Sequence, residues 1–179
     1  MSTKKLSIRQ SLNKAFLKVK PSRQEIELFK EELTNLLDRS NETESEEFHK
    51  NLISDFLKKT YFSPSHFINT KERSDLVIYN GVKANSTVGV IIETKKPTNR
   101  SEMPTVEKLD SKGLQEVLLY YLRERVTNGN MELKHLVVTN VHEWYVFNAT
   151  EFEKYFANDK NLVKLFEDFE SKRLSGTTT

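Results

Sequence analysis

Apolar residues recur every three or four positions along the first third of the chain, the spacing of a helix that buries one face. Polar breaks divide them into three stretches. The first precedes Pro21, the second follows a capping box of Ser22 and Glu25, and the third runs from about Glu46 to Lys59. The apolar positions are Ile8, Leu12, Phe16 and Val19, then Ile26, Phe29, Leu33, Leu36 and Leu37, then Phe48, Leu52, Ile53, Phe56 and Leu57. The pattern predicts three amphipathic helices.

The period changes after Tyr61, where short runs rich in β-branched and aromatic residues predict strands. Three runs, HFINT, SDLVIYN and TVGVIIETKK, come first, and HLVVTN and EWYVFNA come later. A long helix from about Leu114 to Val126 separates the two groups, and two short helices between Thr150 and Leu174 follow. This order predicts an α/β fold with a mixed β-sheet flanked by helices, and the first two helices are an amino-terminal addition.

Composition narrows the class of protein. The chain has 179 residues, of which 36% are hydrophobic, and this suits a single domain core. It contains no cysteine, which excludes disulfides, thiolate metal sites and cysteine nucleophiles. No apolar run approaches the roughly 18 residues of a membrane span, and no signal peptide follows the amino terminus. We therefore expect a cytoplasmic protein with no membrane partner.

Charge is unevenly distributed, although the net charge is only +2. Seven basic residues and no acidic residue precede Glu25. The seven are Lys4, Lys5, Arg9, Lys14, Lys18, Lys20 and Arg23. Such a stretch can bind a phosphate backbone through counterion release, or it can be an ordinary solvated helix face. The sequence leaves both interpretations open.

A carboxylate and two lysines end the apolar run VIIETKKP. If the turn before this strand is centred near Ala84, the numbers of paired residues add up to about 168, and Asp75 lies opposite Glu93. Lys95 then shares the face of Glu93, because side chains alternate along a strand, whereas Lys96 points the other way. A slip of one residue would turn Asp75 away from Glu93 and leave it an ordinary strand-start residue.

Opposed carboxylates at the ends of apolar runs repel each other unless a cation lies between them. Oxygen ligands without a nearby His or Cys favour Mg²⁺, with Mn²⁺ as a substitute. Such an ion takes phosphate oxygens as further ligands, and the Lys95 ammonium could orient a water or stabilise charge on the phosphate. The spacing predicts metal-dependent phosphodiester hydrolysis; the alternative is a strand that simply runs out into solvent.

These residues resemble the PD-(D/E)XK nuclease signature, with Asp75 as its aspartate and Glu93-Thr94-Lys95 as its E-x-K element. A longer region resembles the amino-terminal nuclease region of Type IIG restriction-modification enzymes, which are fused proteins. Its segments are INTKERSDLVIYNG, VGVIIETKKPTNRSEM, LQEVLLYYLRER and HLVVTNVHEWYVFNA. The resemblance implies a restriction-endonuclease-like fold in which Asp75, Glu93 and the Thr94 backbone carbonyl bind metal and Lys95 is the catalytic lysine.

The resemblance also implies two supporting residues in the site. Gln115 matches the glutamine that many members carry on the helix after the E-x-K strand, although Leu119 stands where its usual tyrosine partner would be. The leading helix should supply an acid, for which both Glu46 and Glu47 qualify. We select Glu47 and expect it to act with Gln115 beside the metal ligands.

The resemblance divides the chain into an amino-terminal helical segment at 1–43, a nuclease core at 44–149 and carboxyl-terminal helices and tail at 150–179. It implies a Mg²⁺-dependent endonuclease acting on double-stranded DNA in a bacterial restriction-modification system. The expected partners are downstream methyltransferase and target-recognition domains of a longer chain, with a transient dimer on DNA as one option. Two alternatives are a nuclease-fold module that only binds DNA or neighbouring domains, and a structural α/β module with no nucleic-acid role.

Overall fold

A five-stranded sheet forms the centre of the protein, in a computed structural model that describes residues 5–71 and 74–171, with the backbone alone for Ser74 and Asp75. Strand order follows the chain. The strands are β1 (Ile68–Lys71), β2 (Ser74–Tyr79), β3 (Val88–Thr94), β4 (His135–Thr139) and β5 (Trp144–Asn148). Strands β3 and β4 are parallel, and the other neighbours are antiparallel. The predicted mixed sheet flanked by helices is confirmed.

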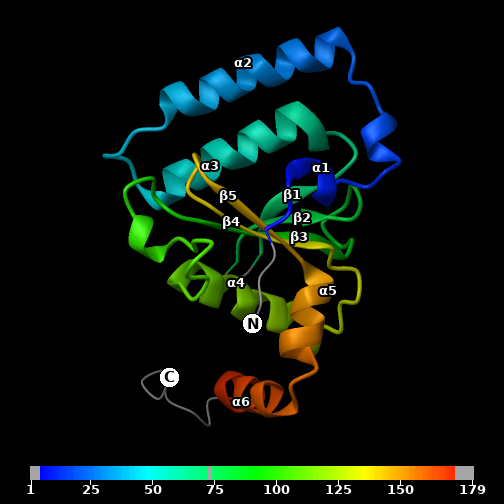
Figure 1. The fold of residues 1–179 in the computed structure, drawn as a ribbon, viewed down its shortest axis with the longest axis vertical. Helices are drawn as coiled ribbons and strands as arrows, with labels where there is room; N and C mark the ends of the chain where they lie inside the picture. The colour runs from blue at the N-terminus through cyan, green and yellow to red at the C-terminus, as the bar shows by residue number, and fades with distance from the viewer. Residues whose placement is uncertain (1–4, 72–73, 172–179) are drawn as a thin grey trace.

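Helices lie on both faces of the sheet (Figure 1). Helix α3 covers one face with α2 stacked beyond it, and α4 covers the other face, with α6 further out. Their bounds are α2 (Arg23–Arg39), α3 (Glu46–Leu57), α4 (Lys112–Leu122), α5 (Ala149–Phe152) and α6 (Lys160–Glu170). Helices α3, α4 and α5 run on into the π-helical turns Lys58–Phe62, Arg123–Thr127 and Glu153–Ala157. None of the helices in these described ranges is long and apolar enough to cross a membrane.

Two apolar clusters, one on each face, hold these layers together. Alternation along β3 directs Ile91 into the cluster with Val117 of α4, and Ile92 into the cluster with Ile53 of α3. These four side chains are at most 2% exposed. Burying each contributes about 1.5–3 kcal/mol relative to exposure, so packing on both faces fixes the orientation of β3.

The register of β2 against β3 is the one predicted from the sequence. Leu76 pairs with Ile92 and Val77 pairs with Ile91, so the numbers of the partners add up to 168. Asp75 is the next residue of β2 toward the end of β3. Its side chain lies outside the described part of the chain, so its pairing with Glu93 stays a prediction.

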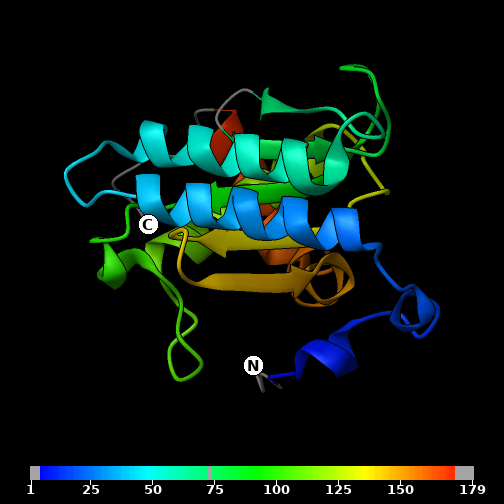
Figure 2. The ribbon, with the colours of Figure 1, turned by 90° about the horizontal axis from the view of Figure 1, so that it is seen from above.

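The lead-in segment, residues 5–22, differs from the prediction. The expected helix from Ile8 to Val19 is replaced by the short α1 (Ile8–Ser11) and a 3₁₀ turn at Phe16–Lys18. Every residue of the lead-in segment is exposed, and Figure 2 shows the segment extending away from the packed layers. An isolated short helix is marginal in water, so the apolar spacing alone does not sustain a long one.

Candidate functional site

Parallel strands β3 and β4 end at the same edge of the sheet, and α3 and α4 begin there (Figure 1). Thr94 pairs with Thr139 at this edge, and the next amide, Lys95 N, donates to the Thr139 carbonyl at 2.7 Å. Ser45 caps α3 and Ser111 caps α4, each through its side-chain oxygen. Two helix starts, with their partial positive charges, therefore face the end of the E-x-K strand.

A buried lysine lies at this edge among four carboxylates. The Lys95 side chain is 2% exposed, and its Nζ donates to Glu93 Oε1 and Glu116 Oε2, both at 2.5 Å. Glu102 Oε2 lies 3.7 Å from Nζ, and Glu46 Oε1 lies 3.9 Å from it. We call these five residues the Lys95 cluster. Lys95 directly follows β3, and the four carboxylates come from α3, β3, the 3₁₀ turn before α4, and α4 itself, so the tertiary fold assembles the cluster.

The charges of the Lys95 cluster stabilise one another. Burial disfavours the Lys95 ammonium, but the negative charge of Glu93 and hydrogen bonds to Glu116 and Glu93 outweigh it, so the pKa of Lys95 is raised. Burial also disfavours the Glu102 carboxylate, but hydrogen bonds with Asn99 and Lys112 outweigh it and lower the pKa of Glu102. Ion pairs among the described residues join four carboxylates to the two ammonium groups of Lys95 and Lys112.

The cluster contains the type of ligand that a hard divalent cation prefers, which is carboxylate oxygen. Glu93 is 2% exposed and lies in β3. Within residues 5–71 and 74–171, the described side chains include no group of three His, Asp or Glu residues placed to hold a metal ion. Asp75, the other predicted carboxylate ligand, lies outside those side chains. Glu93, the Thr94 carbonyl and Asp75 therefore remain the candidate ligands.

The structure brings together two of the predicted site residues and places two others, Glu47 and Gln115, away from them. Glu93 and Lys95 lie side by side, as alternation along the strand predicted. Glu47 does not reach the cluster, because its side chain is 63% exposed and pairs with Lys50 one turn along the helix. Glu46, the alternative acid, is the α3 residue that faces Lys95.

Gln115 also lies away from Lys95. It is exposed, and its Nε2 donates to Asp110 Oδ1 at 2.8 Å. The next residue, Glu116, contacts Lys95 instead. The buried positions of α4 include Gly113 and Val117, and position 116 lies beside them at helical spacing, whereas Gln115 projects outward.

Sequence reasoning missed Glu102, Glu116 and the glycine that lets them approach. A Cβ at Gly113 would lie 2.8 Å from Val138 Cγ1 and 2.9 Å from the Glu102 backbone oxygen. No larger residue fits without moving α4 or the preceding turn. A glycine in the first turn of a helix is costly relative to alanine, and this was the available signal of a close approach.

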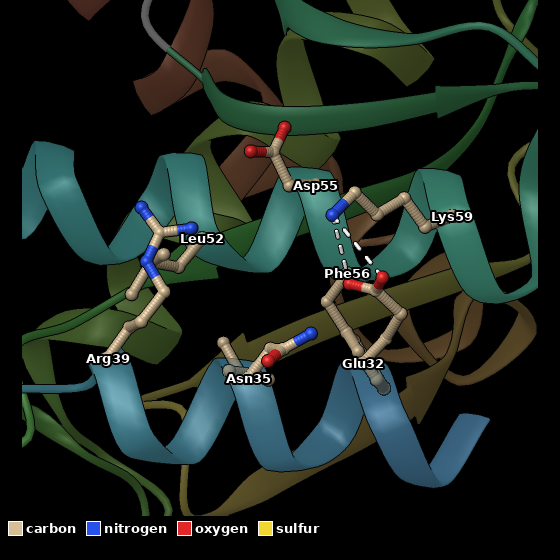
Figure 3. A pocket seen from close by; sticks show the side chains of 8 residues that line it. Glu32, Asn35, Arg39, Leu52, Asp55, Phe56 and Lys59 are labelled. Carbon is tan, nitrogen blue, oxygen red and sulfur yellow. Dashed lines mark hydrogen bonds and ion pairs between the residues drawn. The ribbon is translucent and has the colours of Figure 1, made fainter. Parts of the chain in front are cut away.

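A second surface feature is separate from the Lys95 cluster. Helices α2 and α3 form a groove of about 260 Å³, in which Lys59 of the π-helical turn after α3 pairs with Glu32 of α2 at 3.1 Å (Figure 3). Arg39, Asn35 and Asp55 line the rest of the groove above apolar side chains. No residue of the Lys95 cluster lines it. The groove is therefore not the site of the chemistry expected at β3.

Residues 6–179 match a protein family described as a domain of unknown function, DUF7149. The chain belongs to the DUF7149 family. No curated protein and no solved structure matches it. The DUF7149 match takes in the lead-in segment as well as the sheet and its helices. Because the family description names no activity, the function of this DUF7149 chain has to be argued from the Lys95 cluster.

Proposed function

We propose that this DUF7149 chain is a Mg²⁺-dependent endonuclease domain with a restriction-endonuclease-like fold, which hydrolyses phosphodiester bonds in double-stranded DNA. The observation that carries the proposal is the buried Lys95 ammonium, held 2.5 Å from the Glu93 carboxylate where parallel strands end and two helices begin. The resemblance of Asp75 and Glu93-Thr94-Lys95 to the PD-(D/E)XK signature supports the same chemistry.

Each residue has a defined role in this proposal. Glu93, Asp75 and the Thr94 carbonyl hold the metal, with Glu46 as a further acid from α3. The bound ion supplies Lewis acidity toward a phosphate oxygen and lowers the pKa of a bound water. Lys95 donates hydrogen bonds to the attacking water or to a phosphate oxygen, and its charge offsets the negative charge that develops there.

The charge distribution is compatible with binding of a polyanion such as DNA only if cations are present at the site. Seven of the 28 basic residues precede Glu25, so the remainder of the chain has 21 basic residues against 26 acidic ones. The carboxylates around Lys95 repel a phosphate at short range, and a bound divalent metal would offset that repulsion. We infer that metal and substrate bind cooperatively, and that the basic amino terminus supplies additional attraction to DNA.

The wider context is also proposed from the resemblance. In that context the chain is the nuclease part of a bacterial restriction-modification enzyme, and methyltransferase and target-recognition domains belong to the same longer polypeptide. Sequence specificity then resides outside this domain, and a transient dimer on DNA would give double-strand cuts.

Plasmid nicking by the 179-residue chain tests the proposal. With Mg²⁺, the wild type should convert supercoiled DNA to open circles, and chelator should abolish this. Glu93→Gln and Lys95→Met should each lower the rate by about 1,000-fold, since each removes a group that acts at the reacting phosphate. Glu170→Gln, which removes a remote pair with Arg123 at 2.8 Å, is the matched control and should nick normally. Equal nicking by all variants would contradict the proposal, and DNA binding without nicking would favour the non-catalytic alternative.

A further inference from the structure

We propose that Glu116 is the positioning residue of Lys95, holding its ammonium in place between α4 and β3. This inference rests on the proposed function, because it assigns Lys95 a task that requires a fixed position. It goes beyond the sequence resemblance, which points to Gln115 at this helix. The geometry around Nζ, the packing of α4 and the chemistry of the two carboxylates each support it.

Among the described side chains, Nζ has two short partners, and only one of them is available to act as an anchor. Glu93 and Glu116 both accept from Nζ at 2.5 Å, whereas Glu102 and Glu46 lie beyond hydrogen-bond distance at 3.7 and 3.9 Å. Glu93 is a proposed metal ligand, so a bound cation would compete with the Lys95 ammonium for its carboxylate. Glu116 then remains the principal partner of the ammonium.

Helix α4 is built to bring Glu116 close to β3. The Cβ position of Gly113, one turn before Glu116, lies 3.7 Å from Lys95 Cε and within 3 Å of Val138 and the Glu102 backbone. Val117, the residue after Glu116, is fully buried. The start of α4 therefore packs against the aliphatic part of the lysine and the neighbouring strand, so Glu116 is presented from a fixed backbone.

The far end of α4 is anchored as well. Tyr121 is 1% exposed, and its hydroxyl donates to Glu153 Oε2 at 2.9 Å. Arg125 in the following turn also donates to Glu153, at 2.7 and 2.8 Å. Packing at the start of α4 and hydrogen bonds at its end hold the helix in place. Glu116 is therefore a fixed acceptor to which the flexible Lys95 side chain can bind.

A carboxylate suits this task better than an amide. A charge-assisted hydrogen bond is roughly twice as strong as a neutral one, and a lysine side chain must give up about 2 kcal/mol of rotamer freedom to stay in one place. Without Glu116, Glu93 is the short partner of the ammonium that remains among the described side chains, and the ammonium moves toward the proposed metal ligands. Hydrogen bonds to both carboxylates, one from β3 and one from α4, therefore set the position of Nζ.

NMR of the metal-free protein tests the position without any cleavage assay. A lysine ammonium gives a ¹⁵Nζ signal when buried ion pairs slow its proton exchange, and the wild type should show one such signal that Lys95→Arg removes. Glu116→Ala should abolish the signal and Glu116→Gln should weaken it, while the matched control Glu170→Gln should leave it unchanged. An unchanged signal in Glu116→Ala overturns the inference, whether or not the protein cleaves DNA.

Cleavage kinetics test the consequence. We expect Glu116→Ala to lower kcat by about 10- to 100-fold, with Glu116→Asp partly restoring it, because a misplaced group about 1 Å away costs a factor of this order. The Mg²⁺ concentration for half-maximal rate and the Kd for DNA should change less than twofold. A kcat that recovers at high Mg²⁺ would show Glu116 to be a metal ligand and overturn the positioning role, as would an unchanged kcat. Absence of cleavage by the wild type would instead count against the proposed function.

Gly113→Ala provides a second variant that leaves Glu116 in the chain. Its methyl group would clash with Val138 and the Glu102 backbone, so the start of α4 should shift away from Lys95. We expect it to reproduce the weakened ¹⁵Nζ signal of Glu116→Gln and a lower kcat, as in Glu116→Ala, with thermal unfolding confirming a folded protein. Normal kcat and a normal signal in folded Gly113→Ala would contradict delivery of Glu116 by close packing.

Discussion

The Lys95 cluster and the lead-in segment both depart from the usual rule that apolar side chains are buried and charged ones are exposed. In the cluster, charged groups are buried: Lys95 and Glu93 are each 2% exposed. In the lead-in segment, apolar groups are exposed: Ile8 is 81% exposed and Val19 is 62% exposed. The first departure is compensated by charge pairing within the fold. In the second, none of the apolar side chains at residues 5–22 is buried.

The difference shows that a local pattern becomes structure only where the rest of the chain completes it. Glu93 sits in a strand covered on both faces, so its partners are fixed at atomic distances. The apolar stripe of the lead-in segment has equally regular spacing, yet it yields only α1 and a 3₁₀ turn. Periodicity predicts an amphipathic face, and tertiary contacts decide whether that face forms a helix.

The largest effect should come from removing the cation of the cluster. Lys95→Met removes the ammonium that lies 2.5 Å from the buried Glu93 carboxylate, which should lower the free energy of unfolding by about 3–5 kcal/mol. Urea unfolding at neutral pH measures this. Adding Glu93→Gln to Lys95→Met should recover part of the loss, because it removes the buried negative charge. A Lys95→Met protein as stable as the wild type would show that the buried charges are not coupled.

A smaller effect should follow at the helix start that joins the lead-in segment to the packed layers. Ser22 caps α2: its Oγ accepts from Glu25 N at 3.2 Å, and its own N donates to Glu25 Oε2 at 2.7 Å. Ser22→Ala should cost about 1 kcal/mol in urea unfolding.

The same motif in the lead-in segment is the matched control. Ser7 forms an equivalent capping box with Gln10, but the α1 that it starts buries no residue. We expect Ser7→Ala to change global stability by less than about 0.5 kcal/mol. Equal costs for Ser7→Ala and Ser22→Ala would remove the distinction between the two segments.

The cap of α2 should also respond to pH. The hydrogen bond from the Ser22 backbone, followed by that from its side chain, lowers the pKa of Glu25 below its ordinary value. Because the folded pKa is the lower one, the contribution of Glu25 is present above its unfolded pKa and is lost as pH falls through the folded pKa. An NMR titration of the Glu25 carboxyl should show this lowered pKa, and Ser22→Ala should raise it. An identical pKa in both proteins would contradict the capping contribution.

The smallest effect should be at Ile8. Its side chain is almost fully exposed, so Ile8→Asp should change the free energy of unfolding by less than about 0.5 kcal/mol. Ile91→Ala, at a position of 0% exposure in β3, should cost about 2–5 kcal/mol and serves as the contrast. A large loss from Ile8→Asp would mean that the lead-in segment is packed in solution.

The sheet could be predicted because its information is local. Alternation along β3 sets which residues face α4, and the short connection from β2 sets the register, so the pairing of Leu76 with Ile92 follows from the sequence. The capping boxes and apolar stripes likewise placed α2, α3 and α4 close to their observed bounds.

The composition of the cluster could be predicted only in part. Glu93 and Lys95 lie on one strand and follow from alternation, but Glu102 lies on a turn whose course no period describes. Glu47 and Gln115 lie away from Lys95, whereas their neighbours Glu46 and Glu116 lie near it. Successive residues of a helix point about 100° apart, and the spacing of apolar residues does not define the inward direction to within one residue. The close packing of α4 at Gly113 determines which residue of the helix faces Lys95.

The parallel pairing of β3 with β4 has a consequence for how the protein forms. Parallel neighbours require a crossover, and here it runs through α4 between Thr94 and His135. All five members of the Lys95 cluster are synthesised before β4, yet the carbonyl that receives Lys95 N belongs to Thr139 at the end of β4. During synthesis, Thr139 therefore has to be added to the chain before the hydrogen bond that fixes the Lys95 backbone can form. Assembly of the candidate site is tied to a late, non-local step of folding, and amide exchange at Lys95 should report that step.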